Sequence, residues 1–199
     1  MAVVAITAAA QTNMGKLLIA MPDSLVGYLN TTKRTEMVDF YHMGVKAETF
    51  NRLQNYTVLD SLTERSAELT LSEASTMQLV LLPTSQGDSI ICMVRTYLGE
   101  APESTVSFFD TAWQPLSRQN RIVMPDSSAY THRPDSMSVE EYERLLRLID
   151  PIMLHARLDI TTPSLVFSLS TPMVRKTEKQ QLNAILVERK LNWNGESFN

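Results

Sequence analysis

Apolar residues alternate with a period of two through much of the chain after residue 56, and this pattern constrains the fold most. The clearest run covers residues 89–98, where Ile90, Cys92 and Val94 fall on one face and Ile91 and Met93 on the other. Successive side chains of a β-strand point to opposite faces, so the run predicts a strand. Because both faces are apolar, we expect a central strand that is covered on both sides.

Similar runs lie on either side of this strand and are separated by short turns. They predict strands over residues 67–71, 76–82, 105–109, 152–160, 165–169 and 185–193. The turn signal Ser85-Gln86-Gly87-Asp88 precedes the central strand. Neighbouring strands joined by short turns pair antiparallel, so an antiparallel meander is expected.

Helices are predicted ahead of the strands in each half of the chain. Leucines at helical spacing after Pro22 predict a short helix over residues 22–29 that ends at Asn30, and a second helix that begins at Thr35 and stops at Gly44. Ser138 and Glu141 form a capping box, which predicts a third helix start. That helix is expected to bury Tyr142, Leu145, Leu146 and Ile149.

Together these elements predict an α+β fold, in which helices pack on one face of an antiparallel, curved sheet or sheets. Residues 13–110 would hold helices and the meander, 111–137 a long loop, and 138–199 a helix with antiparallel strands. Residues 13–199 would form one compact unit. Both halves run from helix to strands, so an internal duplication stays open, although no residue-level repeat supports it. The loop is expected to contain an edge strand near residues 121–124.

The first twelve residues resemble the second half of a secretory signal. From Ala2 to Ala10 the chain carries no charge, and the small residues Ala8 and Ala10 precede Gln11 as they would precede a cleavage site. We therefore expect residues 1–12 to be a truncated signal peptide, cut before Gln11, and the protein to be periplasmic or secreted. The alternative is a frayed tail or a first strand. The run is too short for a transmembrane helix.

Several short motifs resemble family 3256 of domains of unknown function, small secreted proteins of gut Gram-negative anaerobes. The matching stretches are Met21-Pro22-Asp23, Met37-Val38-Asp39-Phe40, Leu81-Leu82-Pro83, Ile90-Ile91-Cys92-Met93-Val94, Phe109-Asp110 with Trp113, and Trp193-Asn194-Gly195 with Phe198. The resemblance covers most of residues 14–199 and implies export. It implies no activity, because the family has none assigned.

Composition argues against several classes of function. Lys and Arg number 18 against 22 Asp and Glu, so no basic excess is present to neutralise nucleic-acid phosphates. One cysteine, Cys92, excludes an internal disulfide, and its apolar neighbours indicate a core residue rather than a reactive thiol. With three histidines and no recognisable ligand spacing, we expect neither a metal site nor a cofactor.

The densest set of catalytic residue types lies in the long loop. Asp126, Ser127, Ser128, His132 and Asp135 could form the Ser/His/Asp set of a hydrolase over residues 126–135. A solvated turn region, which favours the same residue types, is the stronger interpretation, because no nucleophile elbow surrounds either serine. We therefore expect no catalytic residues.

Two tryptophans are the best candidates for ligand binding. Trp113 and Trp193 each follow a predicted strand beside a turn, where an indole can stack on a sugar or peptide, and Asp110 would supply an acceptor next to Trp113. The alternative is that both rings cover the edge of the core. The leading hypothesis is an exported, non-catalytic protein that binds a protein or small ligand in the cell envelope. The alternatives are the envelope hydrolase and a structural assembly subunit with an exposed strand edge.

Overall fold

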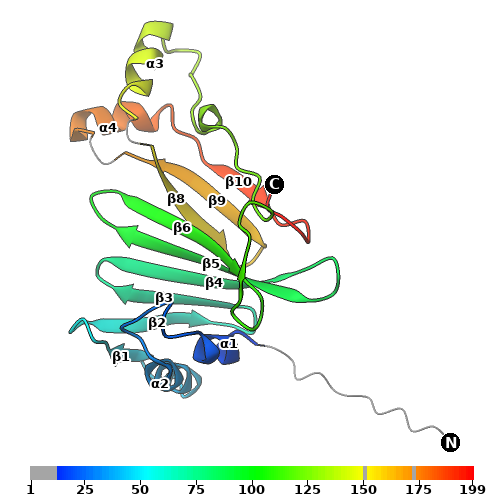
Figure 1. Cartoon of the computed structure of the whole chain (residues 1–199). Coiled ribbons are helices and arrows are strands. Elements are labelled where there is room, and N and C mark those ends of the chain that lie inside the picture. The colour runs from blue at the N-terminus through cyan, green and yellow to red at the C-terminus, as the bar shows by residue number, and fades with distance from the viewer. Residues whose placement is uncertain (1–12, 150–151, 172–173) are drawn as a thin grey trace, which may run out of the picture.

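The computed structural model describes residues 13–149, 152–171 and 174–199. Within them, seven strands form one antiparallel sheet in which each strand pairs with the next in sequence, as Figure 1 shows. They are β1 (Glu48–Phe50), β2 (Tyr56–Leu62), β3 (Ser66–Ser72), β4 (Ser75–Pro83), β5 (Ser89–Leu98), β6 (Pro102–Phe109) and β7 (Pro115–Leu116). The predicted antiparallel meander is confirmed.

The predicted strand over residues 89–98 is confirmed as β5, which pairs with β4 on one side and β6 on the other. Its two faces enter different cores. Ile91 and Met93 belong to the core beneath the first two helices, whereas Cys92 and Val94 belong to a second core on the opposite face. The strand is therefore central and covered on both sides, as its two apolar faces predict.

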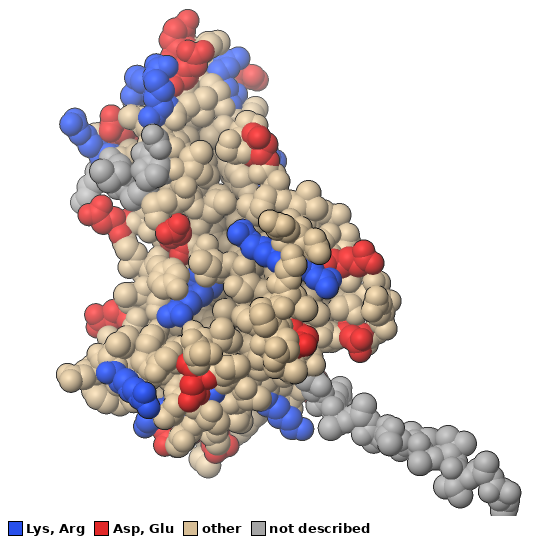
Figure 2. Space-filling model, viewed as in Figure 1, with Lys and Arg blue, Asp and Glu red and all other residues tan. Residues whose placement is uncertain are grey.

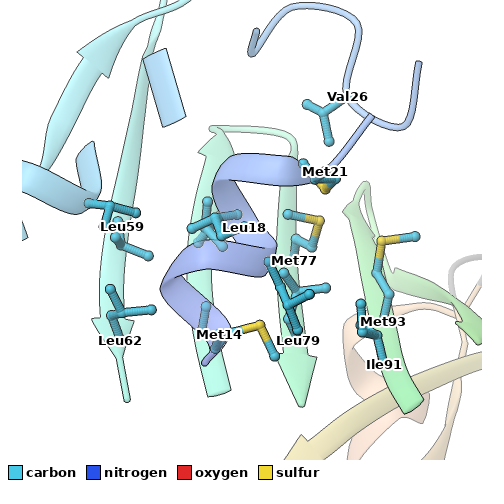
Figure 3. Close-up of a cluster of buried hydrophobic side chains, with 14 of the residues drawn as sticks. Met14, Leu18, Met21, Val26, Leu59, Leu62, Met77, Leu79, Ile91 and Met93 are labelled. Carbon is cyan, nitrogen blue, oxygen red and sulfur yellow. The ribbon is translucent and has the colours of Figure 1, made fainter. Parts of the chain in front are cut away.

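Two helices cover one face of the sheet. They are α1 (Met14–Ala20) and α2 (Thr31–His42). Figure 3 shows Met14, Leu18 and Met21 of the α1 region packed against Met77 and Leu79 of β4. All five side chains are fully or almost fully buried. Burial of apolar area is the main stabilising contribution here, about 1.5–3 kcal/mol for each side chain of this size.

The other face is covered by a second, three-stranded antiparallel sheet with the order β10-β9-β8. Its strands are β8 (Met153–Asp159), β9 (Ser164–Ser170) and β10 (Arg189–Asn192). Ala156, Leu158 and Phe167 pack there against Val94 and Phe108 of the larger sheet. The fold is therefore α+β, with helices on one face of the main sheet and a second sheet on the other.

The remaining helices lie at the far end of the second sheet, as Figure 1 shows. They are α3 (Val139–Leu146) and α4 (Lys176–Asn183), and they enclose a small core of Leu145, Ile149, Leu182 and Ile185. The Ser138 cap is confirmed, because its side chain accepts a hydrogen bond from the Glu141 amide at 3.2 Å. Leu146, predicted to be buried, is exposed.

The helix predicted over residues 22–29 is wrong. That segment consists of turns, and the helix lies before it, at α1. Asn30, predicted to end a helix, instead begins α2, because its side chain accepts from the Lys33 amide at 3.0 Å; Thr35 lies inside that helix. The segment is instead held by Arg34, whose buried guanidinium binds the backbone carbonyls of Met21 and Leu29 near its two ends.

The long loop contains more local structure than predicted. Residues 111–137 include β7 and a 3₁₀ turn, η1 (Ser127–Tyr130). The edge strand expected near residues 121–124 is reduced to a single bridge between Ile122 and Phe198. The last strand is also shorter than predicted, because Ile185 belongs to the small core of α3 and α4. The signal-peptide prediction for residues 1–12 lies outside the described residues.

Candidate functional site

An open hollow of about 1360 Å³ lies at the end of the main sheet where the β4–β5 turn is found. Its walls come from segments far apart in sequence: residues 64–65, the turn at 84–89, residues 110–111, residues 120–121 and residues 195–196. Loops that meet at the end of a rigid sheet commonly carry binding function. Its volume exceeds that of the second groove described below, which is about 320 Å³.

Hydrogen bonds between the β4–β5 turn and the C-terminal loop fix one wall. The Ser85 amide donates to the Gly195 carbonyl at 3.1 Å, and the Ser85 hydroxyl donates to the Glu196 carboxylate at 3.2 Å. Gly195 has a φ of +101°, and a Cβ built there would lie 3.3 Å from the Ser85 nitrogen. Only glycine meets both conditions without strain, so its absence of a side chain permits this close contact.

Asp110 shapes the opposite wall through a tight turn. Its Oδ1 accepts hydrogen bonds from the amides of Ala112 at 2.9 Å and Gln114 at 2.8 Å. The Asp110 carbonyl also accepts from the Trp113 amide at 3.0 Å, and Trp113 adopts a positive φ of 62°. Short side chains such as aspartate stabilise turns in this way. Asp110 therefore lines the hollow and also holds its own loop in shape.

Two arginines present guanidinium groups at the hollow. Arg65 donates from Nη2 to the Leu81 carbonyl at 3.1 Å, and Arg121 donates from Nη1 to the Glu196 carbonyl at 3.0 Å. A guanidinium carries five N–H donors, and within the described part of the chain each group uses one of them in this way. The remaining N–H groups are of the type that binds acceptor atoms. Sequence reasoning missed both arginines because neither lies in a motif.

Charge on the molecule and in the hollow is mixed. Figure 2 shows Lys and Arg side chains interspersed with Asp and Glu over the face in view, with no broad area of one sign. The hollow itself combines Arg65 and Arg121 with Glu64, Asp88 and Glu196. Recognition at this site would therefore depend mainly on local hydrogen bonds, some donated and some accepted by the protein, and less on a long-range electrostatic field.

The two predicted tryptophans lie on opposite faces of the main sheet and do not meet. Trp113 is 5% exposed in the core beneath α1, where its Nε1 donates to the Leu17 carbonyl at 3.0 Å. Trp193 packs half-buried against Phe198, and its Nε1 donates to the Pro83 carbonyl at 2.6 Å. Neither ring lines the hollow, whereas Asp110 does. The two indoles instead anchor the segments that form its walls.

The residues considered for a hydrolase are occupied in local turns. Asp126 caps η1 by accepting from the Ser128 amide at 2.9 Å, and hydrogen bonds from this residue and Ser127 lower the pKa of its carboxyl. His132 is exposed, and its backbone amide donates to the Ile185 carbonyl at 2.7 Å. Among the described residues, no hydrogen bond joins His132 to either serine.

A second, shallower groove of about 320 Å³ lies where β8 crosses the main sheet. Asp60, Glu68, His155 and Arg157 contribute to its lining. Desolvation lowers the pKa of His155, and the positive charge of Arg157 lowers it further against the opposing effect of Glu188. His155 therefore favours its neutral form at the rim of this groove.

The described residues form neither a candidate metal centre nor a candidate membrane span. No group of three or more His, Cys, Asp and Glu side chains is arranged there to hold a metal ion. None of the helices in the described part of the chain has both the length and the apolar character needed to cross a bilayer. Cys92 is fully buried in the second core, and desolvation strongly raises the pKa of its thiol.

Comparison with known proteins agrees with the predicted resemblance. A family model described as "Protein of unknown function (DUF3256)" matches residues 5–198. The fold is similar to a solved structure, described as "Structure of a domain of an uncharacterized protein from Porphyromonas gingivalis W83", with a TM-score of 0.76 and 19% sequence identity. That match covers 92% of this chain and 96% of the other, and at this identity it shows the fold alone. The comparison with curated proteins finds no match.

Proposed function

Since the chain belongs to the DUF3256 family, whose description assigns no activity, we propose a function from the hollow at the end of the main sheet. The protein is an exported, non-catalytic binding protein of the bacterial cell envelope, and the hollow holds its ligand. The observation that carries this proposal is the pair of guanidinium groups, Arg65 and Arg121, held by backbone carbonyls at a hollow of about 1360 Å³.

The chemistry of the walls favours a hydrophilic ligand. Arg65 and Arg121 offer donors, whereas Glu64 and Asp88 offer acceptors, and all four side chains line the hollow. A site for an apolar small molecule is usually lined mainly by hydrophobic and aromatic side chains, which are scarce here. A glycan or an extended peptide presents donors and acceptors along its length and matches such a lining.

Export is supported by the sequence. The uncharged stretch from Ala2 to Ala10, with small residues before Gln11, has the pattern of the end of a signal peptide. N-terminal sequencing of the protein purified from its native host tests this. We expect the chain to begin at Gln11 in the envelope or extracellular fraction. An intact N-terminus found in the cytosolic fraction would contradict export.

Ligand binding is tested with a glycan array and a library of extended peptides, which distinguish the two ligand classes. We expect retention of members of one class, and at least about a tenfold weaker binding, or 1.4 kcal/mol, for Arg65→Ala and for Arg121→Ala. Arg118→Ala is the matched control, because Arg118 is exposed nearby and does not line the hollow.

The thermal midpoint of each variant shows whether it remains folded. Binding that survives in the Arg65→Ala, Arg121→Ala double variant would overturn the assignment of the site. Cleavage of the retained ligand during incubation would instead show that the protein is an enzyme and would overturn its non-catalytic role.

A further inference from the structure

Asn194 and Gly195 lie in the C-terminal loop, and residues 195–196 of that loop form part of the hollow's wall. Of the asparagines in the chain, Asn194 is the one that precedes a glycine. An asparagine side chain can react with the backbone nitrogen of the next residue, and a side chain on that residue hinders the approach. Glycine has no Cβ, so its nitrogen can be approached closely. The local sequence therefore favours a reaction between Asn194 and its own backbone.

A tight turn over residues 194–197 holds the Asn194 side chain in place. The Asn194 amide donates to the Ser197 carbonyl at 3.1 Å. The Asn194 Oδ1 accepts hydrogen bonds from the amides of Glu196 and Ser197, each at 2.9 Å. These bonds fold the side-chain amide over the backbone that begins with the Gly195 nitrogen.

The same two hydrogen bonds polarise the side-chain carbonyl. When a nucleophile adds to the Cγ of Asn194, negative charge develops on Oδ1, to which the Glu196 and Ser197 amides already donate. N–H donors that point at a developing oxyanion lower the barrier to addition at a carbonyl. The fold therefore places the donors of an oxyanion hole around its own asparagine.

The Gly195 nitrogen is available as the nucleophile. Its N–H donates to no hydrogen bond among the described residues, whereas the amides of Glu196 and Ser197 both donate to Asn194. Asn194 is exposed, so solvent can remove the Gly195 amide proton and can later supply water. The nucleophile, the polarised carbonyl and water therefore meet at one exposed turn.

We propose that Asn194 is a self-modification site, at which the native protein deamidates through a cyclic imide. Solvent base removes the Gly195 amide proton, and the nitrogen forms a bond to the Cγ of Asn194. The bond between Cγ and Nδ2 then breaks, and Nδ2 takes up protons from water and leaves as ammonia. The product of this step is a succinimide.

Water then opens the ring at either of its two carbonyls. Attack at Cγ leaves an aspartate at position 194 with the backbone unchanged. Attack at the backbone carbonyl of position 194 leaves an isoaspartate, in which the main chain runs through Cβ and Cγ. Both products carry a carboxylate where the side-chain amide of Asn194 was neutral.

Modification at Asn194 changes the wall of the hollow. The Gly195 carbonyl accepts from the Ser85 amide at 3.1 Å, and the Glu196 carboxylate accepts from the Ser85 hydroxyl at 3.2 Å. Figure 1 shows the C-terminal loop beside the β4–β5 turn. Isoaspartate lengthens the main chain just before these acceptors, so it loosens the contact between the loop and the turn. This consequence holds whether or not the hollow binds a ligand.

Peptide mapping of the full chain after native incubation in mildly alkaline buffer tests the proposal. Mass spectrometry detects the replacement of the side-chain amide by a carboxyl. We expect Asn194 to convert at least about tenfold faster than Asn120, a difference of about 1.4 kcal/mol in activation free energy. Asn120 is the internal control, because it is also exposed but precedes Arg121. Conversion of Asn194 that is no faster than that of Asn120 would overturn the proposal.

The products distinguish the cyclic route from direct hydrolysis of the side chain. Enzymatic methylation labels isoaspartate, and we expect both isoaspartate and aspartate at position 194. Direct hydrolysis would give aspartate alone, so conversion without isoaspartate would contradict the cyclic intermediate. Gly195→Ala would also block the route, but its φ of +101° and the 3.3 Å from the added Cβ to the Ser85 nitrogen strain the turn.

Asn194→Gln is therefore the matched variant, because it keeps a side-chain amide and leaves Gly195 in place. Its longer side chain would need a six-membered ring for the same attack, so this position should stay unmodified over the same period. Hydrogen exchange at the Ser85 amide should become faster as the wild type ages and should stay constant in Asn194→Gln. Unchanged Ser85 exchange in wild-type protein that has formed isoaspartate would contradict the effect on the hollow's wall.

Discussion

The side-chain amide of Gln78 hydrogen-bonds both backbone groups of Leu158, which lies 80 residues away in the sequence. Its oxygen accepts from the Leu158 amide at 2.8 Å, and its nitrogen donates to the Leu158 carbonyl at 3.3 Å. Gln78 lies on β4 of the main sheet and Leu158 on the edge strand β8 of the second sheet. One side chain therefore satisfies two backbone groups at the edge of the second sheet and joins that sheet to the main sheet.

Replacement of Gln78 should destabilise the contact between the sheets. Gln78→Ala leaves the two backbone groups of Leu158 without these partners, which should cost about 1–3 kcal/mol of unfolding free energy. Urea denaturation measures the loss, and hydrogen exchange should show faster exchange of the Leu158 amide. Gln180→Ala, on the exposed surface of α4, should leave both measurements unchanged.

Removal of the Arg34 guanidinium should destabilise the helical layer. Arg34 is fully buried, contacts Asp23 at 3.0 Å, and donates to the carbonyls of Ile19, Met21 and Leu29. Arg34→Met should lower the unfolding free energy by about 3 kcal/mol or more, because several buried carbonyls lose a charged donor. Its surface neighbour provides the control: Lys33→Met removes an exposed ion pair with Glu36 and should cost less than about 1 kcal/mol. Equal losses would show that Arg34 does not organise this layer.

The ion pair between Arg34 and Asp23 should make the stability of the fold depend on pH in the acid range. Desolvation raises the pKa of Asp23, but its hydrogen bond to Arg34 and the charge of Arg34 outweigh this effect and hold the pKa below the ordinary value of 3.8. A carboxyl with a lowered pKa in the folded state stabilises the fold above its unfolded pKa, and that contribution is lost as the pH falls through the folded pKa.

Thermal midpoints measured from pH 6 down to pH 2 should therefore be lower for Asp23→Asn than for the wild type at pH 6, and the two curves should converge in acid. Asp88→Asn, which changes an exposed carboxylate in the β4–β5 turn, should follow the wild-type curve. A constant offset between the Asp23→Asn and wild-type curves at every pH would contradict the role of this charge.

Replacement of Trp113 and replacement of Trp193 should destabilise different parts of the molecule. Trp113→Phe removes the donor to the Leu17 carbonyl in α1, so the α1 amides should exchange faster and the unfolding free energy should fall by about 1–3 kcal/mol. Trp193→Phe removes the donor to Pro83 on the opposite face and should leave exchange in α1 unchanged. Hydrogen exchange read by mass spectrometry separates the two effects, and faster exchange of α1 in both variants would contradict this division.

The strands were predictable because their signal is local. In β5 the side chains alternate between two apolar cores, and the sequence of the strand shows this alternation directly. The cap at Ser138 was equally local, since donor and acceptor lie three residues apart. Short turns between these strands then left the antiparallel meander as the natural arrangement.

The candidate site was only partly predictable. Asp110 reaches the hollow, but Arg65 and Arg121 come to it from segments far away in sequence, and no local pattern marks them. Trp113 and Trp193 follow similar local patterns, yet they enter different cores on opposite faces of the main sheet. Which face a loop returns to after a strand depends on the packing of the whole sheet.

The order of residues alone determined the antiparallel strands, their turns and the α+β class, because period-two burial and turn chemistry act between residues close in the chain. Only the tertiary structure decided the position of α1, whose seven residues are too few for a stable isolated helix. Its last-turn carbonyls are bound by Trp113 and Arg34, 96 and 15 residues from their partners. The helix exists because those distant side chains satisfy its backbone, and that dependence is a property of the assembled fold.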